Sequence, residues 1–183
     1  MALDPRTGPV LVLGIGNPLR GDDGVGALLA EQAARSAVAA AWPVAVRWVQ
    51  QLTPELALDL ADRQAVLFID AALPLSASAT AQASLETVEP LVAAESLDSH
   101  RLEPAQLLAI SALLYGRRPR AALLRVPAAA LGHGTALSPA LRARLPRARR
   151  LLRQWLREQA GAAEVDPLDA RPAAGAEGDG ADA

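Results

Sequence analysis

The sequence predicts an α/β protein of three layers (α/β/α), in which helices cover both faces of a twisted, mostly parallel sheet of about five strands. Short apolar runs alternate along the chain with longer segments of helical periodicity, and strands that take turns with helices form parallel sheets. The run AVLFI at 65–69 is apolar without alternation. That pattern is typical of a central strand buried on both faces.

The expected elements lie between residues 10 and 157. Thr53 and Ser138 each place a hydroxyl directly before a proline, an order that favours the first turn of a helix. Gly116 predicts the end of the helix before it. Strands are expected at 10–15, 44–49, 65–69 and 121–126, an edge strand at 84–88, and helices at 23–40, 54–61, 104–114 and 139–157.

Composition limits the available chemistry. The chain has 183 residues, of which 51% are hydrophobic, enough for one folded domain. It has no cysteine, which excludes disulfides, thiolate metal sites and a cysteine nucleophile. No signal peptide and no apolar run of about 18 residues is recognisable. We therefore expect a cytoplasmic protein that does not interact with membranes.

Composition changes near residue 160. Residues 161–183 carry six acids and one base, Arg171, and almost no large apolar residue. Such a segment cannot offset its ordering entropy by burial. We expect a folded domain at 1–160 and a disordered acidic tail at 161–183. Ending the chain after Ala160 should then leave folding and function unchanged.

The segment GIGNPLRGDDGVG at 14–26 follows the first strand and opens the first helix. It does not fit a dinucleotide-binding motif, because Leu19 stands where that motif needs its third glycine and because two acids would repel phosphate. Acids are instead favoured at a helix N-terminus by its dipole. Asp22 suits the N-cap position. A cap needs only one acid, which leaves Asp23 for function.

Asp70 and His100 are the other candidate site residues. Asp70 ends the strand at 65–69, and sites in open parallel sheets collect beyond the carboxyl ends of the strands, so it can approach Asp23; a loop-start Asx-turn is its alternative role. His100 lies in the loop before the third helix. Two carboxylates and one imidazole would suit a divalent transition metal. His133, between two glycines, is either a competing imidazole or part of a solvated turn.

The seven arginines between residues 142 and 157 raise the question of nucleic-acid binding. No aromatic stacking platform accompanies them. Apolar residues among them recur near helical spacing and predict one buried stripe: Leu141, Leu145, Ala148, Leu152 and Trp155. We therefore expect a docked helix with a solvated basic face and no nucleic-acid partner.

Taken together, these segments resemble the maturation endopeptidases of nickel-iron hydrogenases. The family's opening pattern, G-x-G-N followed by D-D/E-x-x-G, matches GIGN at 14–17 and DDGVG at 22–26. The similarity extends over about residues 10–157. It continues through QLTPELA at 51–57, FIDA at 68–71, the His100 segment, LLYGR at 113–117 and LSP at 137–139.

The resemblance implies an aspartic-type endopeptidase that removes the C-terminal extension of a hydrogenase large-subunit precursor after nickel insertion. Nickel would be presented by the substrate, with no permanently bound cofactor, and the family's metal-contacting positions fall on Asp23, Asp70 and His100. Nickel could polarise a carbonyl or activate water, or position the substrate while Asp23 or Asp70 acts as general base. A nickel-binding accessory protein that cleaves nothing is the alternative function.

Overall fold

The computed structural model describes residues 8–72, 81–91 and 102–163. Its sheet has five strands in the order β2-β1-β3-β5-β4. The strands β1 (Val10–Ile15), β2 (Val44–Val49), β3 (Ala65–Ala72) and β5 (Arg120–Pro127) are parallel, and β4 (Ser84–Val88) pairs antiparallel with β5. The predicted fold class and edge strand are confirmed.

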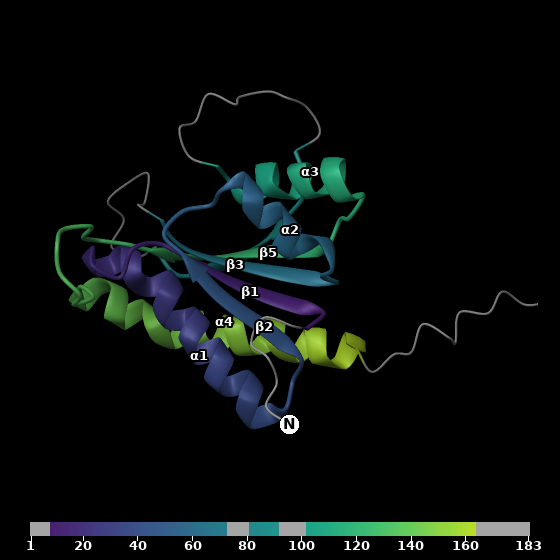
Figure 1. The fold of residues 1–183 in the computed structure, drawn as a ribbon. Coiled ribbons are helices and arrows are strands. Elements are labelled where there is room, and N and C mark those ends of the chain that lie inside the picture. The colour runs from purple at the N-terminus through teal and green to yellow at the C-terminus, as the bar shows by residue number, and fades with distance from the viewer. Residues whose placement is uncertain (1–7, 73–80, 92–101, 164–183) are drawn as a thin grey trace, which may run out of the picture.

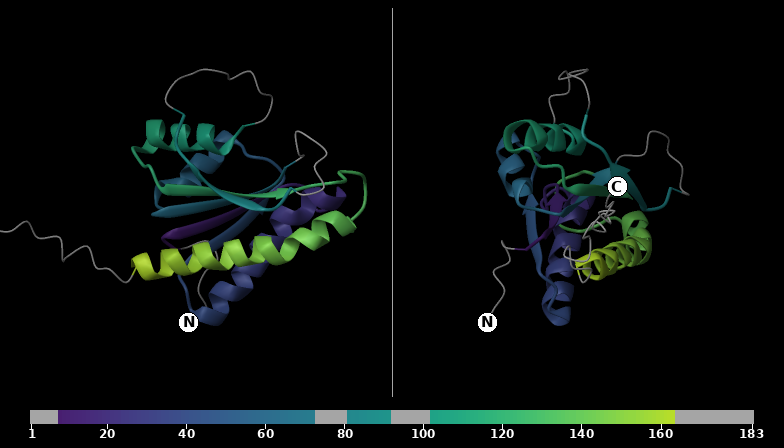
Figure 2. Two further views of the ribbon diagram at one scale, coloured as in Figure 1. Left: turned by 180° about the vertical axis from the view of Figure 1, so that it is seen from behind. Right: turned by 90° about the vertical axis from the view of Figure 1, so that its right-hand side faces the viewer.

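Helices cover both faces of this sheet (Figure 1). On one face lie α1 (Val25–Ala40) and α4 (Pro139–Ala163), and on the other α2 (Ala57–Ala61) and α3 (Pro104–Tyr115). Short 3₁₀ helices, η1 (Gly21–Gly24) and η2 (Pro54–Leu56), precede α1 and α2. The same layers are visible from two further sides in Figure 2. No helix in the described ranges is long and apolar enough to cross a membrane.

The core has two parts, one on each face of the sheet. Leu67 and Ile69 of β3 pack toward α1 and α4, whereas Val66 and Phe68 pack toward α2 and α3. All residues from Ala65 to Ile69 are fully buried, as predicted for a central strand. Burying one such Leu or Phe side chain stabilises the fold by about 1.5–3 kcal/mol, so this strand anchors both halves of the core.

Two elements, β3 and α4, extend by three residues or more beyond their predicted ends. β3 continues to Ala72, so Asp70 lies inside the strand in register with Arg125 and does not begin a loop. The alternative of a loop-start Asx-turn is therefore wrong. α4 continues to Ala163, past the predicted domain end at residue 160, because 158–163 hold mostly good helix formers and no proline. Residues 164–183 lie outside the described residues.

The predicted caps are partly confirmed. Ser138 caps α4, because its Oγ accepts the N–H of Leu141 at 3.1 Å. Gly116 ends α3 with a φ of 65°, in the left-handed region that favours glycine. Thr53 precedes η2 but does not cap it. The Thr53 side chain instead hydrogen bonds to the carboxylate of Glu55. The pKa of Glu55 is lowered mainly by a hydrogen bond from its own backbone and to a smaller extent by the hydrogen bond from Thr53.

Asp22 ties the opening of α1 to the loop between β5 and α4. It is fully buried, and its carboxylate accepts the N–H groups of Ala129 at 2.8 Å, Ala130 at 3.0 Å and Ser138 at 2.7 Å. The Ser138 hydroxyl donates a fourth bond at 2.8 Å. The predicted role as a helix cap is wrong, because these donors belong to a loop more than a hundred residues away and η1 has no side-chain cap.

Electrostatics and backbone bonds strengthen this junction. Burial by itself would raise the pKa of Asp22, but the hydrogen bonds from Ala129, Ser138 and Ala130 outweigh it and hold the pKa below its ordinary value. Beside it, Gly21 N donates to Gly134 O at 2.6 Å. The loop after β5 is thus fixed across the start of α1.

Gly26 lets α1 begin directly on the sheet. A Cβ at this position would lie 2.1 Å from the carbonyl oxygen of Ile15 and 2.8 Å from that of Ile69. These oxygens stand near the ends of β1 and β3. The first turn of α1 therefore rests on both strands, and η1 contacts β3.

Replacing Gly26 by alanine should lower the free energy of unfolding by at least about 2 kcal/mol, because the new methyl group would meet backbone that cannot move aside. Urea titration measures the change. Gly161→Ala is the matched control: this helical glycine has open space around it, and alanine there should be neutral or stabilise by up to about 1 kcal/mol. Equal effects of the two substitutions would contradict the close contact.

Replacing Asp22 by asparagine should destabilise the protein by about 2 kcal/mol or more, because an amide NH₂ would face donors where a carboxylate oxygen now accepts. Asp62→Asn, at an exposed position, should change stability by less than about 0.5 kcal/mol. Since the folded pKa of Asp22 is lowered, its stabilising contribution is present above the unfolded value of about 3.9 and lost as pH falls through the folded value. The difference in free energy of unfolding between wild type and Asp22→Asn, measured by urea titration, should accordingly become smaller below about pH 4. A difference that does not change with pH would contradict the stabilising role of the ionised Asp22 carboxylate.

Candidate functional site

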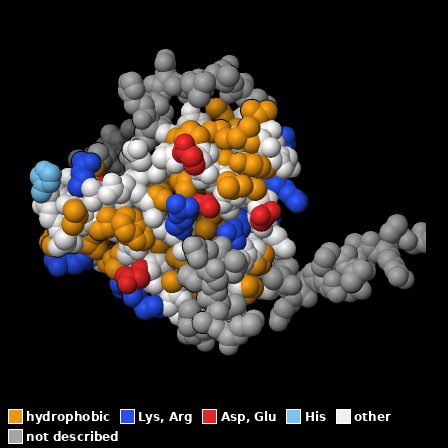
Figure 3. All heavy atoms as spheres, in the orientation of Figure 1, with side chains coloured by type: hydrophobic (Ala, Val, Ile, Leu, Met, Phe, Trp, Pro, Cys, Tyr) orange, Lys and Arg blue, Asp and Glu red, His pale blue; other side chains and the backbone are white. Residues whose placement is uncertain are grey.

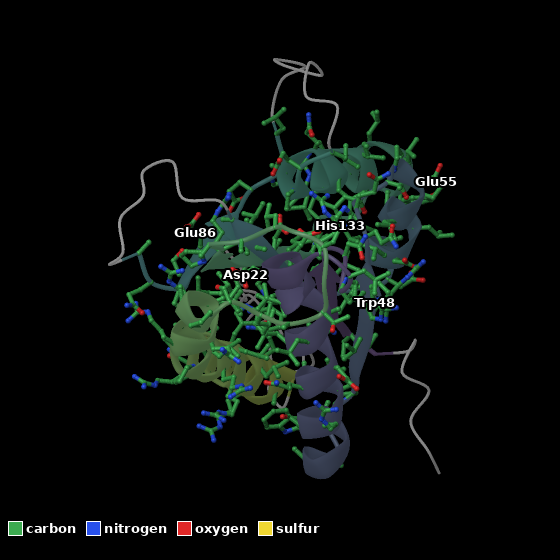
Figure 4. The ribbon with its side chains drawn as sticks, turned by 90° about the vertical axis from the view of Figure 1, so that its left-hand side faces the viewer. Asp22, Trp48, Glu55, Glu86 and His133 are labelled. Carbon is green, nitrogen blue, oxygen red and sulfur yellow. The ribbon has the colours of Figure 1, made fainter. Side chains whose placement is uncertain are left out.

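The candidate site lies at the carboxyl ends of the parallel strands, where η1 meets β3. Figure 4 looks onto this edge, with the loop after β5 passing in front of α1. Asp23 belongs to η1 and Asp70 to β3, and these two segments are in contact. Segments 47 positions apart in sequence thus bring two acids to one edge of the sheet.

The turn before η1 is folded around the carboxylate of Asp23. Its Oδ2 accepts the N–H of Asn17 at 2.9 Å, and the Asn17 side chain in turn accepts the N–H of Leu19 at 2.9 Å. Gly16 has a φ of 125°, and a Cβ there would lie 2.0 Å from the carbonyl oxygen of Asp23 and 3.3 Å from its Oδ1. The G-N and D-D parts of the opening motif are therefore one structural unit that holds Asp23 half-buried in a fixed orientation.

Asp70 projects from the sheet toward the face covered by α2 and α3. Along β3 the side chains alternate, with Phe68 on that face and Ile69 on the other, so Asp70 follows Phe68. The residue is half-buried, and its Oδ1 is inaccessible to water. Its register partner, Arg125, forms an ion pair of 3.5 Å with Glu86 of the edge strand β4. Asp70 thus has one buried carboxylate oxygen and lies near the carboxyl end of the central strand β3.

His100 lies outside the described residues, so the three-ligand set predicted from the sequence is not assembled here. Among the residues that the structure describes, no group of three His, Cys, Asp or Glu side chains could hold a metal. Helix α3, which follows the His100 segment, begins at Pro104 on the same face toward which Asp70 projects. The role of His100 stays a prediction.

His133 is exposed at the same end of the molecule (Figure 4). It lies in the loop after β5, and the neighbouring Gly134 donates its N–H to Leu19 O at 2.9 Å. Within the described part of the chain its side chain makes no hydrogen bond or ion pair. Backbone hydrogen bonds hold this loop across the start of η1, and the side chain of His133 faces solvent.

A groove beside Asn17 was not foreseen from the sequence. Its volume is about 700 Å³, and it runs between the first half of α1 and the edge strand β2. Trp48 on β2 forms one wall and is 49% exposed. A strand tryptophan suggests a core residue, and the small side chains that hollow the opposite wall give no signal of their own. The other apolar lining residues are Pro18, Ala27, Leu28, Ala30, Ala34, Val46 and Leu137.

Apolar side chains also gather on the outer surface of α2 and α3 (Figure 3). Leu58 on α2 is 61% exposed, and Leu113 near the end of α3 is 83% exposed. Leu114 and Tyr115 extend this patch. The LLYGR segment of the family resemblance is therefore a surface feature, not part of the core.

No family model matches this sequence, and no curated protein sequence matches it. Solved structures do match. The hydrogenase maturating endopeptidase HybD from E. coli is 24% identical, with a TM-score of 0.65 over 82% of this chain and 93% of that one. The NiFe hydrogenase maturation protease HycI from Thermococcus kodakarensis KOD1 is 19% identical, with a TM-score of 0.60 over 82% and 92%.

A third structure agrees. The hydrogenase 2 maturation peptidase from a Thaumarchaeota archaeon is 24% identical, with a TM-score of 0.57 over 80% of this chain and 97% of that one. Each match spans nearly the whole of the other protein, so the similarity is that of complete domains. This chain has the fold of the NiFe hydrogenase maturation proteases.

Proposed function

We propose that this chain is an endopeptidase that removes the C-terminal extension of a NiFe hydrogenase large-subunit precursor after nickel has been inserted. The observation that carries the proposal is the contact between η1 with Asp23 and β3 with Asp70, in a chain with the fold of maturation proteases. Those solved structures bear the names of hydrogenase maturation endopeptidases. The opening motif supports it, because its turn is built around the Asp23 carboxylate.

Nickel belongs to the substrate in this proposal. Asp23, Asp70 and His100 would contact it, and the remaining coordination positions would be filled by ligands from the precursor. The hydrogen bond from Asn17 uses one oxygen of Asp23, and the absence of a Cβ at Gly16 keeps space beside the other. A nickel-free precursor would bring no positive charge between the two carboxylates, which would then repel each other.

The chemistry needs a base that activates water at the scissile carbonyl. A carboxylate of the pair Asp23 and Asp70 would take the proton from water and later return it to the leaving amine. The nickel ion would hold the precursor in position beside that pair. Asp22 takes no part in this step, because its oxygens already accept four hydrogen bonds.

The groove along β2 offers room for the polypeptide around the cleavage site. One end of the groove lies at Pro18, which follows Asn17, the residue whose N–H donates to the Asp23 carboxylate. Trp48 forms its exposed wall. Extended peptides commonly bind along the edge of a sheet through their main chain. A precursor segment in this groove would place its backbone close to the turn that holds Asp23.

The nickel-loaded precursor should be shortened by this protein, and the nickel-free precursor should remain intact. Metal-stripped protein is incubated with each precursor without free nickel in solution, and the mass of the large subunit is measured. The expected reason is that the loaded precursor completes a site that Asp23, Asp70 and His100 leave open. Binding without shortening would instead identify a nickel-binding accessory protein, and equal cleavage of both precursors would reject nickel recognition while leaving the protease assignment intact.

Asp23→Asn and Asp70→Asn should each slow precursor cleavage by about 100-fold or more, because about 100-fold is the low end of what a general acid or base contributes. His100→Ala should slow cleavage by a similar factor, because it removes a nickel contact of the proposed site. Asp23→Asn should change stability by less than about 1 kcal/mol, because the amide oxygen can still accept the N–H of Asn17. Asp62→Asn is the exposed carboxylate control. Rates come from mass spectrometry and stability from urea titration; loss of cleavage in His133→Ala with activity retained in His100→Ala would reverse the histidine assignment.

A further inference from the structure

The seven arginines of α4 divide into two groups with different surroundings. Three are used within the fold. Arg144 donates to the carbonyl oxygens of Ala81 at 2.8 Å and Pro127 at 2.9 Å, Arg147 donates to Ala83 O at 2.7 Å, and Arg149 donates to the side chain of Gln32 at 2.9 Å. These bonds fasten α4 to the segment that leads into β4, to β5 and to α1.

The other four form the basic face, defined here as Arg142, Arg150, Arg153 and Arg157. All four are exposed, and within the described residues none of their side chains makes a hydrogen bond or an ion pair. Arg150, Arg153 and Arg157 follow the spacing of one helix face and line a shallow hollow of about 590 Å³. The acid beside them, Glu158, accepts a bond from Gln154 at 3.0 Å.

We propose that the basic face of α4 binds residues 164–183 of the same chain. Those residues follow Ala163, the last residue of α4, in the sequence and carry six acids and one base. The acids form two groups, Glu164, Asp166 and Asp169 followed by Glu177, Asp179 and Asp182. Opposite charge on covalently connected segments identifies the occupant.

The segment is long enough to return along the helix. Twenty residues, 164 to 183, can span at most about 66 Å when extended. Arg142 lies 21 positions before Ala163, which is about 32 Å along a helix. Figure 2 shows α4 on the outside of the molecule along its length, and Arg142, Arg150, Arg153 and Arg157 on it are exposed. The acids can therefore reach all four arginines.

Covalent connection decides between this occupant and a free polyanion. Covalent attachment over a short distance gives an effective concentration in the millimolar range, far above that of a competing nucleic acid in dilute solution. The contact consists of exposed ion pairs, which salt screens over about 10 Å at 0.1 M and about 3 Å at 1 M. The basic face is therefore an intramolecular binding surface whose occupancy falls as salt rises.

A spin label on the tail tests this contact directly. The chain has no cysteine, so Ala181→Cys provides one attachment point without altering charge. At low salt the label should broaden the amide signals of residues 150–157 by several-fold more than those of α3, and the broadening should disappear at 1 M salt. It should also disappear when Arg150, Arg153 and Arg157 are all replaced by glutamine.

The control variant carries Arg117→Gln, Arg118→Gln and Arg120→Gln, which remove the same charge from exposed positions outside α4 and should leave the broadening in place. All six arginines are exposed, so both variants should fold. Adding a single-stranded oligonucleotide at the same concentration as the protein should not displace the labelled tail from the basic face. Uniform broadening over the surface, equal effects of the two triple variants, or displacement by the oligonucleotide would each overturn the proposal, the last by assigning the face to nucleic acid.

Discussion

The buried carboxylate of Asp22 is the interaction on which the candidate site depends. Four donors from one loop converge on it, and that loop connects the last parallel strand to α4. Removing an ionised carboxylate from water is costly unless hydrogen bonds replace its hydration. Here they do, so the charge fastens η1 to a distant part of the chain. Asp22 thus anchors the start of α1 to the start of α4, and the backbone bond from Gly21 to Gly134 adds to this tie.

Asp23 shows how neighbouring acids take separate roles. Asp22 points into the protein and serves its architecture, whereas the Asp23 carboxylate turns to the Asn17 backbone at the sheet edge. The glycines of the segment make this division possible. Gly16 and Gly26 permit backbone contacts that a single methyl group would prevent, and they set η1 against β3.

Local patterns in the sequence are enough to predict the strands of the sheet. β1, β2 and β4 begin and end at the predicted residues, because each is an apolar or alternating run bounded by turn residues. Ser138 and Gly116 act as predicted for the same reason, since a cap involves residues only a few positions apart. Interactions of this kind are encoded within one short segment.

The errors concern contacts between distant segments. The role of Asp22 could not be found locally, because Ala129 and Ser138 have no feature that points to a partner near residue 22. Asp70 was placed after its strand because a charge rarely continues an apolar run, but pairing with β5 carries β3 on to Ala72. The groove at Trp48 arises from α1 and β2 together. The edge at which Asp23 and Asp70 lie was predictable, because parallel strands end on one side of a sheet.

The turn that holds Asp23 would also affect the affinity of the proposed site for a ligand. Its carboxylate is oriented by the Asn17 N–H and by backbone packing at Gly16, which exist before any ligand arrives. Ordering a loop on binding weakens affinity, and a group already in place avoids that loss. In the proposed site Asp23 would therefore act as a preorganised oxygen ligand, because the direction of its carboxylate is set when the protein folds.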